Sequence, residues 1–346
     1  MSANIFPNQL GYRMPAEWEL HEATWLSWPH DVETWPDQLP ELESIYLEMI
    51  GHLVQGEKVH ILVHDEKSQV YVSEKLKQKR SQKNVFIHLI ETDSPWIRDY
   101  GPIFLTGKPK KTAFSSWIFN AWGRKYAAFQ KDNQVPEKMG RILEIERFKV
   151  DVVLEGGAID VNGLGSALAV EASCLNPNRN PDLSRKDMER YLNDFLGIRH
   201  MIWLEEGIFG DDTDGHIDEV ARFVAPRTVV AALEENQQSQ NFKVLRKNWE
   251  RLSQSLDQDG KRLKVITIPM PEKVEIKGKS CPASYANFYI GNKVVLVPIF
   301  HQKMDQIALG ILKDIFRDRQ VIGISAVPLI YGLGAFHCMT QQQPNV

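Results

Sequence analysis

The sequence predicts an α/β fold built from a repeated unit. A helix, an apolar strand and a loop with glycine or polar residues follow one another five times after residue 66. The units recur roughly every 45 to 65 residues, a period typical of a degenerate internal repeat. If the units are arranged radially, the loops at the strand ends all point to one axis. The 346 residues are 43% hydrophobic, enough for a large core. A length of this kind suggests two domains, but single barrels and propellers also reach it, and we expect one domain over residues 1–346.

The N-terminal part is predicted to begin with a tryptophan-rich strand. Residues 14–36 hold four of the nine tryptophans, and ATWLSWP within them reads as a strand that ends at Pro29. The tryptophans are typical of a core or, alternatively, of a pocket wall. Their positions are Trp18, Trp25, Trp28 and Trp35.

Helical periodicity then predicts a helix over Glu41–Gln55 that stops at Gly56. A strand at Lys58–His64 follows, and a charged helix near Ser68–Arg80 is expected to face solvent. The next elements are predicted as strand Asn84–Ile90, a short strand after Pro102, a loop with Trp117, Phe119, Trp122, Tyr126 and Phe129, helix Pro136–Ile145, and strands Lys149–Leu154 and Ala167–Glu171.

In the second half, Ser184 with Asp187 three residues later has the spacing of a capping box and predicts the start of a helix. The final helix, Met304–Phe316, is expected to pack through residues that include Ile307, and the apolar run Val321–Ile330 reads as a buried strand. The elements between are strands His200–Leu204, Ala221–Val224 and Thr228–Leu233, helix Gln240–Asp257, strand Leu263–Ile268, and a hairpin that turns at Gly291–Asn292.

Composition excludes several classes of protein. The net charge of −4 comes from acidic and basic residues mixed along the chain, without the clustered positive face of a nucleic-acid-binding protein. The N-terminus lacks the layout of a signal peptide, and no apolar run is long enough to cross a bilayer. Three cysteines without a CxxC pair indicate a reducing, cytoplasmic compartment, and Cys174 and Cys281 are expected to be buried or incidental.

The C-terminal stretch YGLGAFHCMTQQQP carries the candidate nucleophile, Cys338. A cysteine on a glycine-rich turn after a strand leaves its sulfur room for a substrate. The thiolate is the reactive form of this side chain. The alternative is a small buried hydrophobe.

Three earlier loops offer partners for this cysteine. Trp96–Asp99 joins a tryptophan to a charge pair, for which the alternative is a pair on the surface. Glu155–Gly157 places an acid before two glycines, at a pocket floor or in a solvated bend. Asp211–Glu219 holds five carboxylates and one histidine, but its spacing fits neither a calcium loop nor a zinc site, so we expect no metal. A histidine between carboxylates suits acid–base chemistry near neutral pH.

A cysteine, a histidine and several carboxylates together suit chemistry on a cationic amidine. Paired carboxylates match the flat guanidinium group through forked hydrogen bonds. A cysteine can attack the central carbon of this group, and a histidine can protonate the departing ammonia. The sequence therefore predicts covalent catalysis on a guanidino substrate, without a cofactor.

The motifs WIRDYGP, EGG, CLNPNRNP, TDGHIDEVARF, SYANFYI and HCMTQQQP resemble those of the agmatine deiminase family, within the bacterial peptidylarginine-deiminase-like proteins. The resemblance extends over nearly the whole chain. It implies a five-bladed α/β propeller (a pentein) of ββαβ units with pseudo-fivefold symmetry. It also implies a cytoplasmic enzyme of polyamine and putrescine biosynthesis that acts on agmatine without a cofactor, and it suggests a homodimer.

Residue roles follow from the same resemblance. Cys338 is similar to the nucleophile, His216 to the general acid and base, and Asp99 and Asp218 to the carboxylates that grip the guanidinium. Glu155 occupies the position whose carboxylate orients the histidine, while His337 is expected to be structural. Further substrate contacts are expected from Trp96, Asp212, Trp122 and Asn287.

The chain departs from the family pattern after EGG, where Asp160 replaces a common histidine, and in GLGAFHC, where Leu333 replaces a glycine and Ala335 an asparagine. We expect both changes to touch the pocket rim. Deiminases of free or peptidyl arginine remain alternatives, and a pocket-facing arginine (Arg98, Arg124 or Arg222) would favour them. An amidinotransferase and a propeller that only binds a partner are further alternatives.

Overall fold

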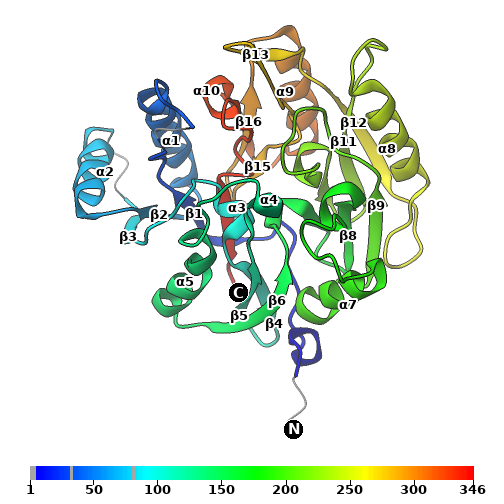
Figure 1. Ribbon diagram of the computed structural model, residues 1–346, viewed down its shortest axis with the longest axis horizontal. Coiled ribbons are helices and arrows are strands. Elements are labelled where there is room, and N and C mark those ends of the chain that lie inside the picture. The colour runs from blue at the N-terminus through cyan, green and yellow to red at the C-terminus, as the bar shows by residue number, and fades with distance from the viewer. Residues whose placement is uncertain (1–4, 32–33, 80–82) are drawn as a thin grey trace.

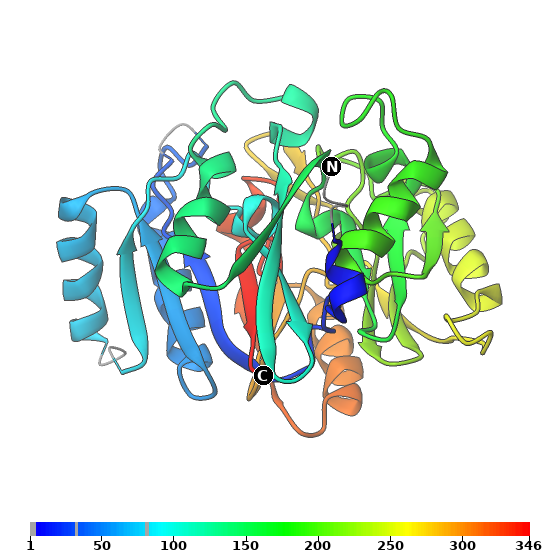
Figure 2. The same cartoon turned by 90° about the horizontal axis from the view of Figure 1, so that it is seen from below.

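The structure is a computed structural model that describes residues 5–31, 34–79 and 83–346. The described chain forms five sheets of three or four strands and one two-stranded sheet. The larger sheets have the strand orders β18-β1-β2-β3, β4-β5-β6, β7-β8-β9, β10-β11-β12 and β15-β16-β17. Figure 1 shows the helices α1, α5, α7, α8 and α9 toward the outside of the molecule and the C-terminus near its middle. In Figure 2, α2 lies at one end of the molecule and α8 at the other.

The strands have these bounds: β1 His21–Ser27, β2 Lys58–Val63, β3 Val85–Leu89, β4 Ile103–Gly107, β5 Lys111–Ile118, β6 Glu146–Val153, β7 Ile159–Val161, β8 Ser166–Val170, β9 His200–Leu204, β10 Ala221–Ala225, β11 Thr228–Leu233, β12 Lys264–Pro269, β13 Val274–Ile276, β14 Lys279–Cys281, β15 Tyr289–Ile290, β16 Val294–Ile299, β17 Gln320–Ser325 and β18 Thr340–Pro344. The α-helices are α1 Leu39–Leu53, α2 Glu66–Gln78, α3 Ile97–Tyr100, α4 Ala121–Arg124, α5 Val135–Leu143, α6 Glu171–Cys174, α7 Arg185–Leu196, α8 Phe242–Gln254, α9 Lys303–Ile315 and α10 Val327–Ile330. Short 3₁₀ turns are η1 Pro7–Leu10, η2 Asp132–Gln134, η3 Gly156–Ala158 and η4 Ile217–Glu219.

Each larger sheet repeats one pattern of pairing. An antiparallel pair is followed by a parallel pair, as in β4-β5-β6 and β10-β11-β12. Parallel neighbours need a crossover connection, and each of the six crossovers contains one of the longer helices: α1, α2, α5, α7, α8 or α9. The first sheet obeys the same rule only because the C-terminal strand β18 pairs antiparallel with β1. The two ends of the chain thus complete one sheet together.

Most predicted elements are present within a few residues of their expected bounds. The capping box at Ser184 is formed, with reciprocal hydrogen bonds to Asp187. The hairpin at Gly291–Asn292 joins β15 to β16. The helix predicted near Ser68–Arg80 is α2, and Arg80 itself lies outside the described residues.

Several predictions about elements are wrong. The run Val321–Ile330 is a strand only to Ser325, because Pro328 near the start of α10 fits a helical turn. Ile307 is 50% exposed and does not pack in the core. The stretch KTAFSSWI, expected to be partly loop, is strand β5, and TQQQP, for which no strand was predicted, is strand β18. Both strands are largely buried although they contain polar residues. These polar residues hide the apolar pattern by which a buried strand is recognised in a sequence.

The core consists of two clusters of buried apolar side chains. The larger cluster contains Trp25, Trp28 and Trp35, so three of the four N-terminal tryptophans are core residues. Trp35 also has its ring against Trp96, with the ring centroids 5.7 Å apart. Among the described residues, no helix combines the length and apolar character that crossing a membrane requires.

Candidate active site

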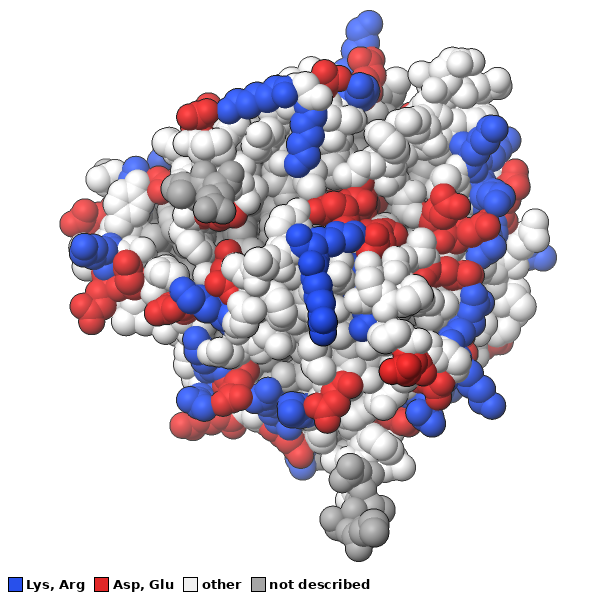
Figure 3. Space-filling view, in the orientation of Figure 1, with Lys and Arg blue, Asp and Glu red and all other residues white. Residues whose placement is uncertain are grey.

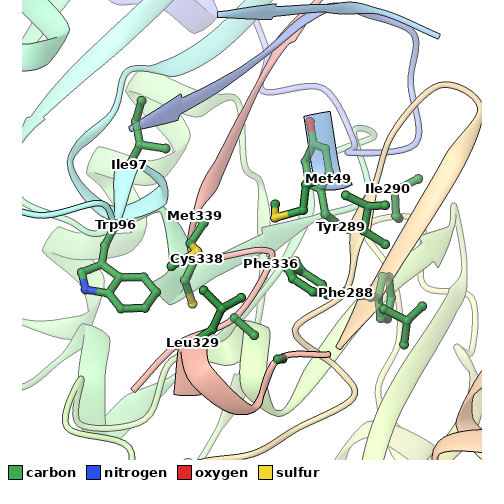
Figure 4. Close-up of a cluster of buried hydrophobic side chains, with 14 of the residues drawn as sticks. Met49, Trp96, Ile97, Phe288, Tyr289, Ile290, Leu329, Phe336, Cys338 and Met339 are labelled. Carbon is green, nitrogen blue, oxygen red and sulfur yellow. The ribbon is translucent and has the colours of Figure 1, made fainter. Parts of the chain in front are cut away.

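Cys338 lies directly before β18 on the wall of a cavity of about 550 Å³. The side-chain amide of Asn287 donates a hydrogen bond to the sulfur (3.2 Å). The amide oxygen accepts from the backbone N–H groups of His337 (3.1 Å) and Cys338 (3.4 Å). Figure 4 shows Cys338 next to the ring of Trp96. Asn287 thus fixes both the sulfur and the backbone of this segment, while the sulfur still borders the cavity.

Two glycines before Cys338 make room for aromatic rings. A Cβ atom at Gly332 would lie 2.1 Å from the ring of Trp35, and one at Gly334 would lie 2.6 Å from the ring of Trp96. The same Cβ at Gly334 would lie 3.1 Å from Cβ of Cys338. Tryptophan rings therefore occupy part of the space that these glycines leave, and the rest opens to the cavity.

Asp99 is buried at the end of the WIRD segment. Its Oδ1 atom accepts a hydrogen bond from the backbone of Gly157 (2.9 Å), and its Oδ2 atom accepts from Nε1 of Trp122 (2.9 Å). Burial raises the pKa of Asp99 to about 6, and neighbouring Asp218 raises it while His216 and the Trp122 hydrogen bond lower it. The carboxylate is therefore oriented by two donors but poorly solvated.

Asp218 is held by a histidine that the sequence argument treated as structural. Nδ1 of His337 is 2.7 Å from Oδ2 of Asp218, and Nε2 is 2.8 Å from Glu17. The same Oδ2 atom lies 3.5 Å from the sulfur of Cys338. Although burial opposes it, the hydrogen bond and charge of His337 lower the pKa of Asp218. His337 thus fixes a carboxylate beside the thiol.

His216 lies among acids but makes no side-chain hydrogen bond. Neither ring nitrogen has a partner among the described residues, although Nδ1 is 3.7 Å from Oδ1 of Asp99. Burial alone would lower its pKa, but the surrounding carboxylates, Asp99 and Asp218 foremost, outweigh burial and raise it. Its backbone N–H donates to Asp211 (2.9 Å), which fixes the loop. The imidazole is therefore free to exchange a proton with a ligand.

These three side chains converge over one backbone position. A Cβ atom at Gly157 would lie 2.6 Å from Nδ1 of His216, 2.8 Å from Oδ1 of Asp99 and 3.1 Å from Oδ2 of Asp218. Only a residue without a side chain leaves these atoms where they are. The site thus requires the second glycine of the EGG motif, because a side chain at this position would displace these atoms.

Glu155, at the position where the family resemblance implies a carboxylate that orients the histidine, lies against Arg179. Oε1 of Glu155 accepts from Nε of Arg179 (2.6 Å), and no hydrogen bond joins it to His216 in the described structure. Its charge still contributes to the raised pKa of His216. Arg179, from the CLNPNRNP loop, also bonds the carbonyl of Thr213 (2.8 Å), so it ties Glu155 to the segment that carries His216.

The buried arginines point away from the cavity. Arg98 donates to the carbonyl of His337 (3.2 Å) and to the side chain of Gln342 (2.6 Å), so it anchors the segment around Cys338. Arg222 pairs with Glu17 (2.8 Å) and with Asp160 (2.6 Å). Arg124, the third candidate, is exposed and is not among the residues that line the cavity.

The prediction that Asp160 touches the pocket rim is wrong, since Asp160 is buried against Arg222 and does not line the cavity. Ala335 is also buried away from it. Leu333 does line the cavity, with φ at 72° where the family commonly has glycine.

Acidic residues dominate the polar wall of the cavity. Of the described lining residues, Asp31, Asp93, Asp99, Asp132 and Asp212 are acidic, and Lys279 is basic. Nζ of Lys279 lies over the ring of Tyr331, 5.6 Å from its centroid. Asp212 accepts a hydrogen bond from Tyr126. Trp96 and Trp122 are also lining residues, and Figure 3 shows acidic side chains grouped near the middle of this face.

The acidic surroundings act on the thiol as well. Burial raises the pKa of Cys338 well above its usual range, and Asp218, Glu219 and Asp99 raise it further, while the Asn287 hydrogen bond lowers it. In the free protein the thiol is therefore protonated at neutral pH. A cation bound beside the sulfur would offset the negative charge of these acids and lower the pKa of the thiol.

A larger cavity, of about 750 Å³, lies elsewhere, among residues such as Tyr12, Lys108 and Arg199. None of the candidate site residues lines it. Size therefore does not identify the site here, whereas the convergence of a thiol, an imidazole and carboxylates does.

Sequence reasoning missed Glu17, Arg179 and Glu219 at this site. Glu17 sits in the tryptophan-rich N-terminal stretch, where a carboxylate gives no local signal. Its buried contacts with His337 and Arg222 exist only once the sheets are assembled. Arg179 lies in a motif that had been recognised, but without a role.

Comparison with known proteins agrees with the site. The sequence pattern of the Porphyromonas-type peptidyl-arginine deiminase family matches residues 13–344. A Legionella pneumophila (strain Paris) protein, named as a candidate agmatine deiminase, is 36% identical over 99% of this chain and 98% of its own length.

Two solved structures are similar along the whole chain. The agmatine deiminase of Enterococcus faecalis, described as catalysing its reaction, is 30% identical with a TM-score of 0.93, covering 99% of this chain and 98% of its own. A cysteine-to-serine variant of the Campylobacter jejuni agmatine deiminase with substrate bound is 30% identical with a TM-score of 0.87, covering 96% of each chain. The protein therefore has the α/β fold of these enzymes, and the chain belongs to the Porphyromonas-type peptidyl-arginine deiminase family.

Proposed function

We propose that the protein is an agmatine deiminase, which hydrolyses the guanidinium group of agmatine to N-carbamoylputrescine and ammonia. One observation carries the choice of substrate. The cavity that leads to Cys338 is lined by five aspartates, of which buried Asp132 keeps its proton at neutral pH because its pKa is about 8, and Lys279 is the one cation among the described lining residues. Agmatine carries a positive charge at each end and no carboxylate, so its charges match this wall.

The guanidinium would sit over Gly157, between Asp99 and Asp218. Both carboxylates have fixed orientations, because each accepts hydrogen bonds from buried donors. Forked contacts to two carboxylates hold the planar cation with its carbon facing the sulfur of Cys338.

Binding of the cation also activates the nucleophile. The acids that raise the pKa of Cys338 would be neutralised by the guanidinium, so the thiol loses its proton to solvent and attacks the amidine carbon. Protonated His216 then gives its proton to the departing ammonia, which leaves an S-alkylthiouronium. A water molecule that passes a proton to His216 adds to this carbon, and collapse of the adduct releases the ureido product and the sulfur.

The remaining pocket residues would bind and shape the substrate. Trp96 and Trp122 line the channel, and Trp122 also orients Asp99. Asp212 lies on the cavity wall, where it would attract the distal ammonium. Asn287 would hold the sulfur rather than contact the substrate, since both ends of its amide are already engaged by the segment of Cys338.

Arginine is the alternative substrate, and the cavity offers few groups that could bind its carboxylate. Its carboxylate would meet an acidic wall, and Arg98 and Arg222 are engaged in buried contacts away from the cavity. Lys279 is the available cation, so arginine and an arginyl peptide belong in the assay beside agmatine.

The arrangement of the fold supports the same proposal. We infer that the five ββαβ sheets are the blades of a propeller with a pseudo-fivefold axis, so residues 1–346 act as one catalytic domain. Loops from separate blades, Trp96–Asp99, Glu155–Gly157, Asp211–Asp218 and Gly332–Cys338, all reach the cavity or the side chains around it. The Pro269–Pro271 loop is not among its lining residues.

The test measures ammonia and ureido product from agmatine, arginine and an arginyl peptide. We expect turnover with agmatine, little with arginine, and none with Cys338→Ser. Cys281→Ser is the matched control, because Cys281 is also a buried free thiol but does not line the cavity. Product from Cys338→Ser at the normal rate, or a preference for arginine, would overturn the proposal.

A further inference from the structure

A second cluster of possible ligands lies behind the cavity wall at Cys338, besides the two carboxylates expected to hold the guanidinium. Asp218, Glu219 and Cys338 each offer one ligand atom, and these three atoms lie within 4.8 Å of one another. All three residues are buried, with exposed fractions of 0%, 3% and 8%. A thiolate and two carboxylates at this spacing match the ligands of a zinc ion, which binds sulfur at about 2.3 Å and oxygen at about 2.0–2.2 Å.

Unused polar atoms indicate that this cluster is open to a ligand. Oδ1 of Asp218 and Oε2 of Glu219 are buried and have no hydrogen-bond partner among the described residues. Buried polar atoms are normally paired, and an unpaired one is costly. A cation in contact with both carboxylates would satisfy them together.

The surroundings would hold such ligands in place. His337 occupies Oδ2 of Asp218 (2.7 Å) and is itself fixed by Glu17 (2.8 Å), which leaves Oδ1 available. The carbonyl of Glu219 accepts from Ser284 (2.7 Å). Hydrogen bonds of this kind to a ligating carboxylate orient the ligand in many metal sites.

We propose that a divalent zinc ion binds Cys338, Asp218 and Glu219 and reversibly inhibits the protein. On binding, a Zn–S bond forms and the thiol proton leaves to solvent, with no change in oxidation state. Because Cys338 lines the cavity, water from the cavity would supply the fourth ligand. Because the ion takes the sulfur and Asp218, it excludes a guanidino substrate, and this competition is the part that rests on the proposed function.

The experiment uses the whole chain in metal-free buffer, with Zn²⁺ followed by calorimetry and Co²⁺ followed by absorption. We expect one ion per chain and, with Co²⁺, a thiolate-to-metal charge-transfer band. Cys338→Ser should abolish the band, and Glu219→Gln should raise the dissociation constant for Zn²⁺ at least about tenfold. Cys281→Ser should keep the band, since Cys281 is outside the cluster.

Circular dichroism of each variant separates loss of a ligand from loss of the fold. A Co²⁺ band that survives in folded Cys338→Ser, unchanged affinity in folded Glu219→Gln, or no band in the wild type would each overturn the proposal. Agmatine is then added to the Co²⁺ complex and should remove the band. Turnover of agmatine in metal-free buffer with no metal band on adding Co²⁺ refutes the metal site alone, whereas a metal band with Co²⁺ and no agmatine turnover in metal-free buffer refutes the proposed function alone.

Discussion

The side-chain amide of Asn287 donates a 3.2 Å hydrogen bond to the sulfur of Cys338, although the two residues are 51 positions apart. The amide oxygen of the same residue accepts hydrogen bonds from the consecutive backbone N–H groups of His337 and Cys338. Asn287 therefore ties the β15 region to the nucleophile segment. Its hydrogen bond lowers the pKa of this thiol, against the effect of the acids around it.

Replacing Asn287 should impair chemistry more than substrate binding. Asn287→Ala removes the donor to the sulfur and both backbone contacts, so we expect kcat with agmatine to fall about 10- to 100-fold, the worth of a hydrogen bond to a charged group. The thiol pKa should rise, because the amide lowers it. Steady-state kinetics and the pH dependence of alkylation by iodoacetamide measure the two effects. Asn248→Ala, at a buried asparagine bound to the backbone of Glu205 and Glu206, is the control. Equal effects of both variants on kcat would contradict the role.

Removing the charge of Asp218 should move thiol reactivity and turnover in opposite directions. Asp218 is among the acids that raise the pKa of Cys338, so Asp218→Asn should lower it. Iodoacetamide is neutral and needs no guanidinium clamp, so we expect faster alkylation at pH 7 to 8. Agmatine turnover should fall by at least about 100-fold, because half of the clamp is lost.

The contrary result for Asp218→Asn is slower alkylation at every pH, which would mean that the carboxylate assists the thiol rather than opposing its ionisation. Asp212→Asn serves as the comparison. Asp212 lines the same cavity but is not among the main causes of the raised pKa of Cys338, so alkylation should stay close to the wild-type rate.

From the sequence, the reactive residues of this site could be predicted, but the residues that hold them in position could not. Cys338, His216, Asp99 and Asp218 stand out because reactive residue types lie in glycine-rich loops at strand ends, and these loops do converge. The partners that position them carry no comparable signal. Glu17 binds His337 and Arg222 across more than 200 residues of sequence, so its role depends entirely on how the sheets assemble.

The missed strands have a related cause. Strand β18 reads as a polar tail, because Gln341 and Gln342 do not alternate with apolar residues. Both are nevertheless buried, since β18 lies between β1 and the WIRD segment, where Arg98 binds Gln342. Buried polar residues that find partners from distant segments cannot be distinguished from a solvated tail by periodicity.

A methyl group at Gly157 should disable the site without unfolding the protein. The Cβ of Gly157→Ala would lie 2.6 Å from His216 and 2.8 Å from Asp99, so both side chains must move. We expect agmatine turnover to fall by at least about 100-fold, the loss that a misplacement of about 1 Å can cause. Gly310→Ala is the control, because its Cβ meets nothing within 4 Å in α9, and it should be neutral or stabilising. Thermal unfolding and turnover are measured on both, and full activity in Gly157→Ala would contradict the assigned geometry.

Asp132 should make stability depend on pH. It accepts hydrogen bonds from the backbone N–H of Asp93 (2.7 Å) and the hydroxyl of Ser94 (2.8 Å), at the entrance to the Trp96 segment. Burial nevertheless raises its pKa to about 8, against the lowering effect of these bonds. In the unfolded chain the pKa of an aspartate is about 4, so the folded state keeps a proton that the unfolded state releases. The contribution of Asp132 is therefore fully favourable below pH 4 and is lost as the pH rises to 8.

Asp132→Asn should remove this loss, because the amide stays neutral and keeps an acceptor for the backbone N–H of Asp93. Relative to the wild type, the unfolding free energy of the variant should rise between pH 5 and pH 8 by up to about 1.4 kcal/mol per pH unit. Urea unfolding at three pH values measures the difference. Asp151→Asn provides the control, since Asp151 is exposed and pairs only with Lys149 at the surface. Parallel pH profiles for Asp132→Asn and the wild type would mean that the buried carboxyl is ionised already at pH 5, and that its hydrogen bonds with Asp93 and Ser94 outweigh the cost of burial.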